Sequence, residues 1–171
     1  VHLNVRHGIG FVPQGHNVFR ELSVEQNLRI AGLLHDPAYA QTVCEIFPIL
    51  QERKQQVAGS LSGGQQQMLA LGMSLMTRPR LLLLDEPTTG VDAVSRKEFW
   101  EMLQLLKAEG ITIIVSTPYM DEATLCDQVA LIQEGKILGI DLGTTNSAMA
   151  IWPATSRRTS PPKPTRGAAT T

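Results

Sequence analysis

Three stretches of the chain are rich in apolar residues over the length of a β-strand. Residues 81–84 are four leucines, and residues 111–117 hold mainly Ile, Val and Thr, as expected for strands buried on both faces of a parallel sheet. A shorter stretch at 9–14 is ended by Pro13, because proline cannot donate to a strand ladder. A helix predicted at 94–109 separates the two longer runs, and this order requires a right-handed parallel crossover. The pattern predicts an α/β fold.

Helical periodicity dominates the part of the chain between the first two of these strands. Ser23, followed three residues later by Gln, has the reciprocal capping pattern, and apolar residues then recur at helical spacing over 24–34. A second helix follows and is ended near Pro48. A third, at 62–76, starts on a serine and two glycines and carries an apolar stripe. These helices predict a helical subdomain over about 22–76.

The C-terminal part of the chain changes character twice. Residues 128–132 and 136–140 flank Glu134-Gly135, a hairpin-type turn that predicts two antiparallel strands at the edge of the sheet. Within the separate segment at 139–152, we interpret the residues up to Ile140 as the end of the edge strand that starts at Lys136, and Leu142 to Ile151 as a leftover segment. From 153 to 171 the composition shifts to Pro, Ser, Thr, Ala and basic residues, which predicts a disordered tail.

Composition narrows the classes of partner. The chain has 171 residues and a net charge of -1, so no overall field recruits nucleic acid, and we expect no nucleic-acid partner. The hydrophobic content of 43% is enough for one sizeable core. Every apolar run is far shorter than the roughly 18 residues that span a bilayer. Because Val1 opens in mid-pattern and is not methionine, we expect a truncated N-terminus.

Two motifs carry chemistry. The first, which we call the helix-start motif, lies at the start of a predicted helix, where backbone amides and the helix dipole favour an anion. The second motif is the pair Asp85 and Glu86, which end the leucine strand. Asp85 is placed there to hold Mg²⁺ through water, and Glu86 to polarise an attacking water. Either motif alone is also explained by a glycine turn or a strand-end cap, but together they predict phosphoryl transfer. The residues of the helix-start motif are Ser62, Gly63, Gly64 and Gln65.

The two motifs closely resemble those of the ATP-binding-cassette (ABC) ATPases over about residues 9–138. The resemblance implies a partial P-loop NTPase-type parallel sheet in a domain at 1–138, with ATP and Mg²⁺ as cofactors. It implies that the residues from Ser62 to Gln65 grip the γ-phosphate held by an opposite ATPase subunit. It also implies that Asp85 supports the metal and that Glu86 is the catalytic base.

Two further residues match the family's loops. Gln14, in Phe-Val-Pro-Gln, resembles the glutamine that touches Mg²⁺ and couples to a membrane subunit. Asp92, in Gly-Val-Asp, resembles the aspartate of the loop that crosses the dimer interface. The resemblance therefore implies two partners, a second ABC ATPase subunit paired head to tail and a membrane subunit. It implies a cytoplasmic location, peripheral to the inner membrane.

The sequence also departs from the family pattern. No Gly-x-x-x-x-Gly-Lys-Ser/Thr occurs in it, and its only Gly-Lys pair, at 135–136, falls in the predicted hairpin turn. That loop normally holds the β- and γ-phosphates, so we expect weak ATP binding in cis and hydrolysis only where a partner supplies the lysine. The family's switch histidine falls at Pro118, which has no titratable group.

The sequence leaves two alternatives open. Residues 10–76 look like branched-chain amino-acid importer subunits and 88–138 like exporter subunits, so the chain is also compatible with a composite, engineered or spliced product without ATPase activity. Residues 139–147 resemble the first phosphate loop of seventy-kilodalton heat-shock chaperones, with Asp141 serving Mg²⁺ and Thr144 and Thr145 contacting phosphate. That resemblance suggests a chaperone-like ATPase fragment.

Overall fold

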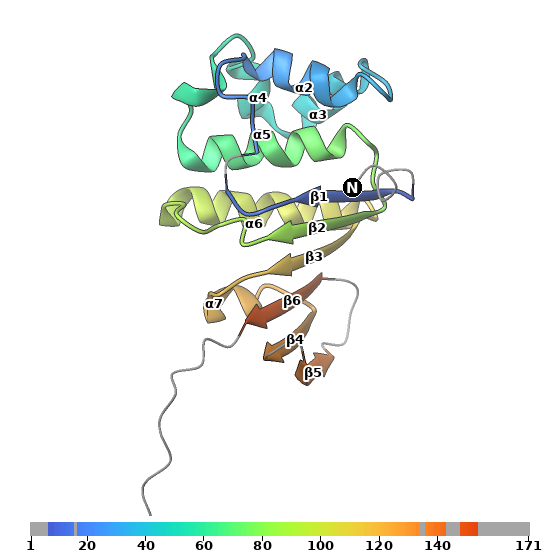
Figure 1. Cartoon of the computed structure of the whole chain (residues 1–171), viewed down its shortest axis with the longest axis vertical. Helices are drawn as coiled ribbons and strands as arrows, with labels where there is room; N and C mark the ends of the chain where they lie inside the picture. The colour runs from blue at the N-terminus through green and yellow to red at the C-terminus, as the bar shows by residue number, and fades with distance from the viewer. Residues whose placement is uncertain (1–6, 16, 134–135, 143–147, 154–171) are drawn as a thin grey trace, which may run out of the picture.

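The computed structural model describes residues 7–15, 17–133, 136–142 and 148–153 (Figure 1). The strands are β1 (Ile9–Val12), β2 (Leu81–Asp85), β3 (Thr112–Ser116), β4 (Gln128–Gln133), β5 (Lys136–Leu142) and β6 (Ala148–Pro153). The helices are α2 (Val24–Gly32), α3 (Tyr39–Ile46), α4 (Pro48–Glu52), the 3-10 helix η1 (Ala58–Ser60), α5 (Gly63–Leu75), α6 (Ala93–Ala108) and α7 (Met120–Ala123). The strands form one six-stranded sheet in the order β1-β2-β3-β6-β4-β5.

The first three strands form a parallel core. Val12, Leu84 and Val115 lie side by side on neighbouring strands, and Asp85 pairs with Ser116 at the carboxyl end. Helix α6 connects β2 to β3, so the predicted strand, helix, strand order in a parallel sheet is confirmed. The carboxyl ends of β1, β2 and β3 consequently meet at one edge of the sheet.

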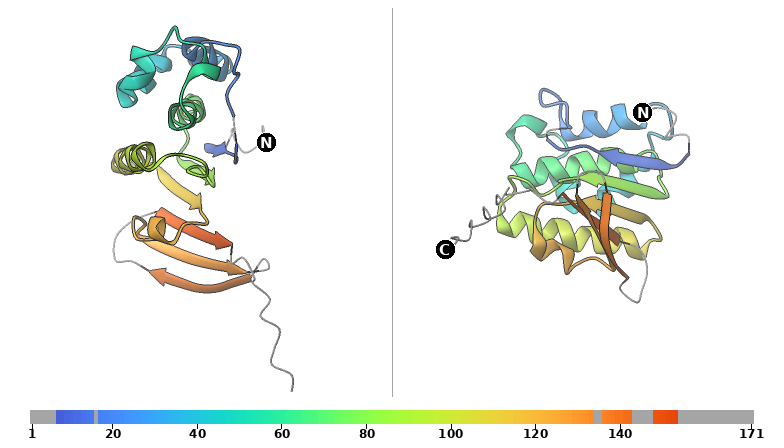
Figure 2. Two further views of the ribbon diagram at one scale, coloured as in Figure 1. Left: turned by 90° about the vertical axis from the view of Figure 1, so that its left-hand side faces the viewer. Right: turned by 60° about the horizontal axis from the view of Figure 1, so that its bottom comes forward.

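The described helices cover one face of the sheet only (Figure 2). Leu82 and Leu84 are 0% and 2% exposed, whereas Leu81 and Leu83 alternate with them and are only partly buried. Phe11, which pairs with Leu83, is 49% exposed. The prediction that the leucine strand is buried on both faces is therefore wrong for the described residues, because no described helix lies over the second face.

Helices α2 to α5 pack on one another beside the sheet (Figure 1). Ser23 caps α2 with the reciprocal pattern that the sequence predicted. Gly72 of α5 allows a close approach, since a Cβ there would lie 3.0 Å from Leu50 and 3.1 Å from Val43. Asn27 is fully buried and bonds to the backbone of Phe19 through both ends of its amide. This layer therefore has its own packed interior, and Asn27 fixes the segment that leads into α2.

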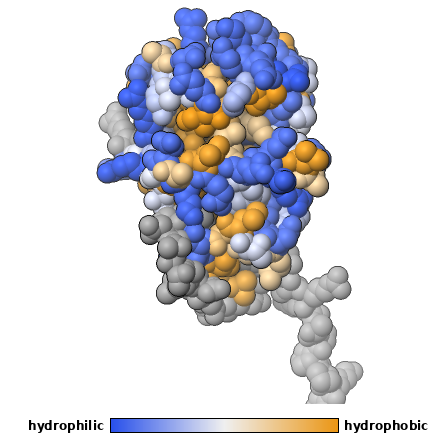
Figure 3. Space-filling view, turned by 180° about the vertical axis from the view of Figure 1, so that it is seen from behind, coloured by the Kyte–Doolittle hydropathy of each residue, from blue (hydrophilic) through white to orange (hydrophobic). Residues whose placement is uncertain are grey.

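A groove separates this helical layer from the end of α6. On the helical side of the molecule, apolar surface gathers across the middle (Figure 3). The groove has a volume of about 570 Å³, and its lining includes Leu75, Leu105 and Ile111. At its rim, the Arg78 guanidinium lies 4.4 Å from the centre of the Tyr39 ring and 2.7 Å from Asp36. These contacts join the end of α5 to α3.

The last strand of the sheet does not lie at its edge. β6 runs parallel between β3 and β4, with Ala150 opposite both Val115 and Val129. Residues 148–151 are therefore not the leftover segment that the sequence suggested. The predicted hairpin is confirmed, because β4 and β5 pair in antiparallel fashion and β5 forms the edge.

Residues 143–147, with the chaperone-like threonines, and the tail at 154–171 lie outside the described residues. Within the part of the chain that is described, no helix combines the length and apolar character needed to cross a membrane.

Candidate functional site

The two predicted acidic residues lie at the carboxyl edge of the parallel sheet. β2 ends at Asp85, and Gln14 follows β1 on the neighbouring strand. The Gln14 amide Nε2 donates to Glu86 Oε2 at 2.6 Å, and Thr89 Oγ1 donates to the same oxygen at 3.1 Å. The structure thus brings Gln14 and Glu86, which are far apart in the sequence, into direct contact.

Ser116 at the end of β3 holds the acidic pair from the other side. Its Oγ donates to Asp85 Oδ1 at 2.5 Å. The backbone amide of Glu86 donates to the Ser116 carbonyl at 2.9 Å and lies 3.2 Å from its Oγ. Sequence reasoning missed Ser116, although a hydroxyl at the end of an apolar strand next to the acidic strand was the available signal.

Glu86 has an unusual backbone. Its φ is 44°, in the left-handed region that glycine adopts without strain and other residues rarely adopt. Such a conformation costs of order 1–3 kcal/mol and persists where surrounding contacts hold it. Here the contacts from Gln14, Thr89 and Ser116 hold it.

The predicted anion-binding motif starts α5. Ser62 is the N-cap: its Oγ accepts from the Gln65 amide at 3.3 Å, and Gln65 Oε1 accepts from the Ser62 amide at 3.2 Å. Because a hydroxyl both accepts and donates, the Ser62 proton stays available to an anion. The amides of Gly63 and Gly64 belong to the first turn, where helix geometry provides no intrahelical acceptor. The capping interpretation and the anion-binding interpretation are therefore compatible.

The motif is linked to the acidic pair through the loop at 87–92. A Cβ on Gly64 would lie 2.4 Å from Ser95 Cβ and 3.5 Å from Val91, so α5 begins directly against that loop and α6. Among the described residues, no hydrogen bond joins Ser62 or Gln65 to Asp85 or Glu86. The structure therefore places the two motifs on either side of one loop and does not bring them into contact.

Asp92 ends this loop as the N-cap of α6. Its Oδ1 accepts from the amides of Val94 at 3.1 Å and Ser95 at 3.0 Å. The hydrogen bond from the Ser95 amide holds the pKa of Asp92 below its usual range. The carboxylate is therefore ionised and fixed in place next to the start of α5.

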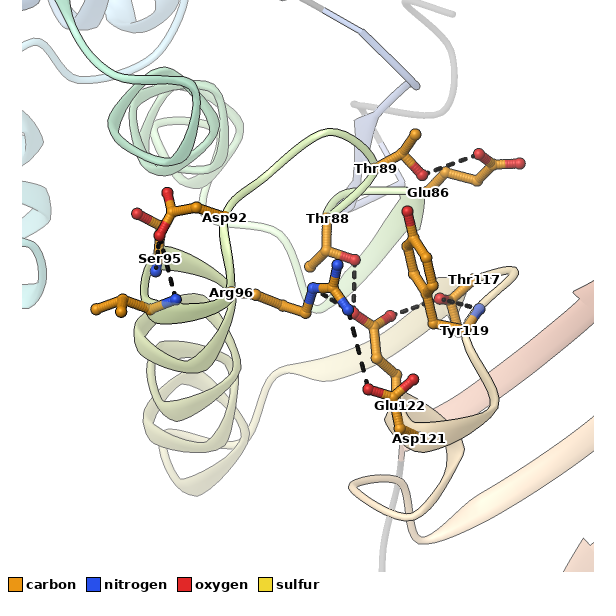
Figure 4. Close-up of polar contacts among 11 residues, drawn as sticks. Glu86, Thr88, Thr89, Asp92, Ser95, Arg96, Thr117, Tyr119, Asp121 and Glu122 are labelled. Atoms are coloured by element: carbon orange, nitrogen blue, oxygen red, sulfur yellow. Dashed lines mark hydrogen bonds and ion pairs between the residues drawn. The ribbon is translucent and has the colours of Figure 1, made fainter.

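A buried acidic side chain joins the segments that follow β2 and β3, and sequence reasoning missed it. Glu122 of α7 is 1% exposed and accepts from Thr88 Oγ1 at 2.6 Å and from Thr117 Oγ1 at 2.5 Å (Figure 4). The Arg96 side chain of α6 approaches it to 3.8 Å and lies 4.3 Å from the centre of the Tyr119 ring. Helical periodicity gave no signal for Glu122, because α7 is a single turn.

The residues at this edge fit a nucleotide-borne Mg²⁺ better than a separate metal centre. Within the described residues, no group of three His, Cys, Asp or Glu could hold a metal ion. Mg²⁺ is usually held by one or two protein oxygens together with substrate phosphates and water. Asp85 offers an exposed carboxylate, and the Gln14 amide oxygen is left free when its nitrogen donates to Glu86. Such a pair of oxygens suits a metal that arrives with a nucleotide.

The fold and the motifs define a class, and comparison with known proteins agrees. The model of the ABC transporter family matches residues 2–89, which is half of the chain, so the chain belongs to that family. A nucleotide-free ATP-binding cassette from an ABC transporter superposes with a TM-score of 0.74 over 82% of this chain and 63% of its own, at 24% identity. Its likeness shows the fold alone. The cbiO1 protein of Clostridium perfringens, part of the ABC transporter complex cbiONQ, gives 0.73 at 28% identity over 81% and 58% of the two chains.

Curated relatives come from more than one branch of the family. The high-affinity branched-chain amino acid transport ATP-binding protein BraG of Pseudomonas aeruginosa is 40% identical over 81% of this chain and 62% of its own length. The probable multidrug ABC transporter ATP-binding protein YbhF of Escherichia coli is 40% identical over 76% of this chain and 23% of its own. The Nod factor export ATP-binding protein I of Mesorhizobium japonicum is 39% identical over 77% and 40%. The chain thus spans less than two thirds of each of these relatives.

Proposed function

We propose that the chain is an ATP-binding subunit of an ABC transporter and that it forms one half of an ATP site shared with a second subunit. The observation that supports this most is the start of α5, where Ser62 caps the helix and the first-turn amides of Gly63 and Gly64 lack an intrahelical acceptor. Gln65 completes the cap. This arrangement suits a phosphate presented from outside the chain.

The acidic edge of the sheet supplies the second part of the proposal. Asp85, with the Gln14 amide oxygen, is our candidate for holding a nucleotide-bound Mg²⁺. Glu86 is our candidate general base, because its carboxylate is oriented by Gln14 and Thr89 next to the strand end. ATP and Mg²⁺ are the proposed cofactors, and ATP hydrolysis coupled to transport is the proposed reaction.

An ATP site of this kind needs a lysine loop to hold the β- and γ-phosphates. We propose that the helix-start motif faces such a loop on a second subunit and completes that subunit's site in trans. Asp92, fixed as the cap of α6 beside Gly64, is our candidate for a contact across the same interface.

Two partners complete the proposal. The relatives are named as ATP-binding proteins for transport or export, which supports a membrane subunit as a partner of this chain. We propose a second ATPase subunit as well, because the start of α5 suits a phosphate presented from outside the chain. The proposed location is the cytoplasmic side of the inner membrane, through that membrane subunit. The relatives differ in the solutes that they are named for.

No observation favours the composite or the chaperone-like alternative. BraG aligns at 40% identity over 144 residues, which is longer than either of the two family-like segments on which the composite hypothesis depends. Asp141 lies in the edge strand β5, and Thr144 and Thr145 lie outside the described residues. We retain 1–138 as the proposed ABC domain, with a helical subdomain at about 22–76.

The test is ATP hydrolysis by a mixture. An intact cassette subunit that contains the lysine loop is inactivated at its own signature serine, so that its homodimer does not turn over. Adding this chain should restore hydrolysis, and adding the Ser62→Ala variant should restore at least tenfold less. If the mixture neither associates nor hydrolyses ATP, the proposed function is wrong.

A further inference from the structure

Glu122 is a carboxylate with almost no access to water. It is 1% exposed, and each of its two oxygens accepts one hydroxyl proton, from Thr88 at 2.6 Å and from Thr117 at 2.5 Å. A buried polar group is costly unless it is hydrogen-bonded. The two threonine hydroxyls therefore satisfy the Glu122 side chain, and removing either leaves a buried oxygen without its partner.

The two threonines belong to the two segments that carry the acidic edge. Thr88 follows Glu86 in the loop after β2, and Thr117 directly follows Ser116, which bonds to Asp85. Glu122 therefore bridges the chain just beyond β2 to the chain just beyond β3. A change in its side chain acts on both segments at once.

A third segment reaches the same carboxylate. Arg96 of α6 lies 3.8 Å from Glu122 Oε1, and its guanidinium is stacked at 4.3 Å on the ring of Tyr119, which precedes α7 (Figure 4). Arg96 is one turn from Asp92, the cap of α6. Ser95, next to Arg96, meets Gly64 at the start of α5. The contacts thus run from Glu122 through α6 to the helix-start motif.

We propose that Glu122 is a positioning residue that fixes the loop at 87–92 between the acidic edge and the start of α5. We call Glu122, Thr88, Thr117 and Arg96 the Glu122 clamp. The clamp holds the loop from one side, and Gly64 with Ser95 holds it from the other. The inference rests on the proposed function, because it assigns the clamp a role in the shared ATP site.

The clamp is tested first without nucleotide. Glu122→Gln keeps the size of the side chain but has one acceptor oxygen and an NH2 donor, so the proton of one of the two threonine hydroxyls loses its acceptor. Amide hydrogen exchange at residues 89–92 should become at least tenfold faster, while amides in β2 and β3 keep their protection. Asp121→Asn is the matched control, since Asp121 is the neighbouring acid, its side chain is 76% exposed and 3.9 Å from Arg96, and its carboxylate accepts from neither Thr88 nor Thr117. The control should leave exchange unchanged.

The second measurement is hydrolysis by the mixture with the partner that is inactive at its own signature. Glu122→Gln should lower kcat about tenfold with KM for Mg-ATP changed less than twofold, and Thr88→Val should do the same. Thr88→Ser keeps the hydroxyl and should retain most of the rate. If the clamp only stabilised the fold, the loss of kcat in each variant would correlate with its melting temperature and would not depend on whether residue 88 has a hydroxyl.

The outcomes separate the two proposals. Unchanged loop exchange in Glu122→Gln, or equal losses of kcat in Asp121→Asn, would overturn the clamp. Equal rates for Thr88→Val and Thr88→Ser would overturn it too. If the unmodified chain supports no hydrolysis in any mixture, the proposed function fails, and the exchange experiment still decides whether Glu122 fixes the loop.

Discussion

Two neighbouring glycines begin α5, and the structure predicts opposite effects when each is replaced by alanine. A Cβ on Gly63 would meet only the Gly90 carbonyl oxygen, at 4.0 Å. A Cβ on Gly64 would lie 2.4 Å from Ser95 Cβ and 2.8 Å from Ser95 Oγ. Ser95 Cβ is fixed to the backbone of α6, so the two helices must separate to admit the methyl group.

The magnitudes follow from these distances. Replacing glycine by alanine at an unhindered helical position stabilises by roughly 0.5–1 kcal/mol. Forcing a methyl group into a packed contact costs about 1–3 kcal/mol. Gly63→Ala should therefore raise the free energy of unfolding, and Gly64→Ala should lower it by about 1 kcal/mol net. For a chain of this size, 1 kcal/mol corresponds to roughly 2–4 °C in Tm.

The assay is thermal and urea unfolding of both variants, followed by a double-mutant cycle with Ser95. Ser95→Gly removes the clashing atoms and should recover most of the stability lost in Gly64→Ala. Ser95→Ala keeps Cβ and should recover little. If both glycine variants change stability in the same direction, or if Ser95→Gly does not couple to Gly64→Ala, the packing argument is refuted.

Three further predictions concern other parts of the chain. Glu86→Gly should be more stable than Glu86→Ala by about 1 kcal/mol in urea unfolding, because both lose the carboxylate but only glycine accepts a φ of 44° without strain; equal stabilities would contradict the strained turn. Ala150→Pro should destabilise by about 1–3 kcal/mol, because β6 is paired on both sides and proline removes a ladder hydrogen bond, whereas the control Ala150→Gly keeps the backbone amide and should cost only roughly 0.5–1 kcal/mol; a harmless proline would place β6 elsewhere. The pKa of Asp92 in the folded chain lies below its usual range, so its helix cap stabilises the fold fully above about pH 4, and this stabilisation is lost as the pH falls through the folded pKa. The difference in unfolding free energy between the unmodified chain and Asp92→Ala should therefore shrink at low pH, while the difference between Asp92→Asn and Asp92→Ala should stay constant.

Much of the architecture could be predicted from local patterns. The leucine run at 81–84, the capping pattern at Ser23 and the turn signal between 128–132 and 136–140 are each local in sequence. The structure has a strand and a capped helix at the first two and an antiparallel strand pair on either side of the third. Both acidic residues were found because they directly follow an apolar strand. Proximity in sequence was enough for these features.

The features that were missed depend on contacts between distant segments. Nothing around Ala150 indicates that the last strand pairs between β3 and β4, since the order of strands in a sheet is a property of the whole chain. The burial of Glu122 depends on Thr88 and Thr117 reaching it from two other elements. The leucine strand suggested two covered faces because periodicity reports apolar character and not which helices arrive to cover it.

The most direct test of the account is how association with an intact cassette subunit depends on the γ-phosphate. Sedimentation would compare the mixed dimer in Mg-ATP and in Mg-ADP, using a partner that binds but does not hydrolyse ATP. Recognition of the γ-phosphate by the start of α5 predicts association at least tenfold tighter in Mg-ATP, about 1.4 kcal/mol, and predicts that Ser62→Ala abolishes most of the difference. Association that is equal in the two nucleotides, or unaffected by Ser62→Ala, would contradict the shared site.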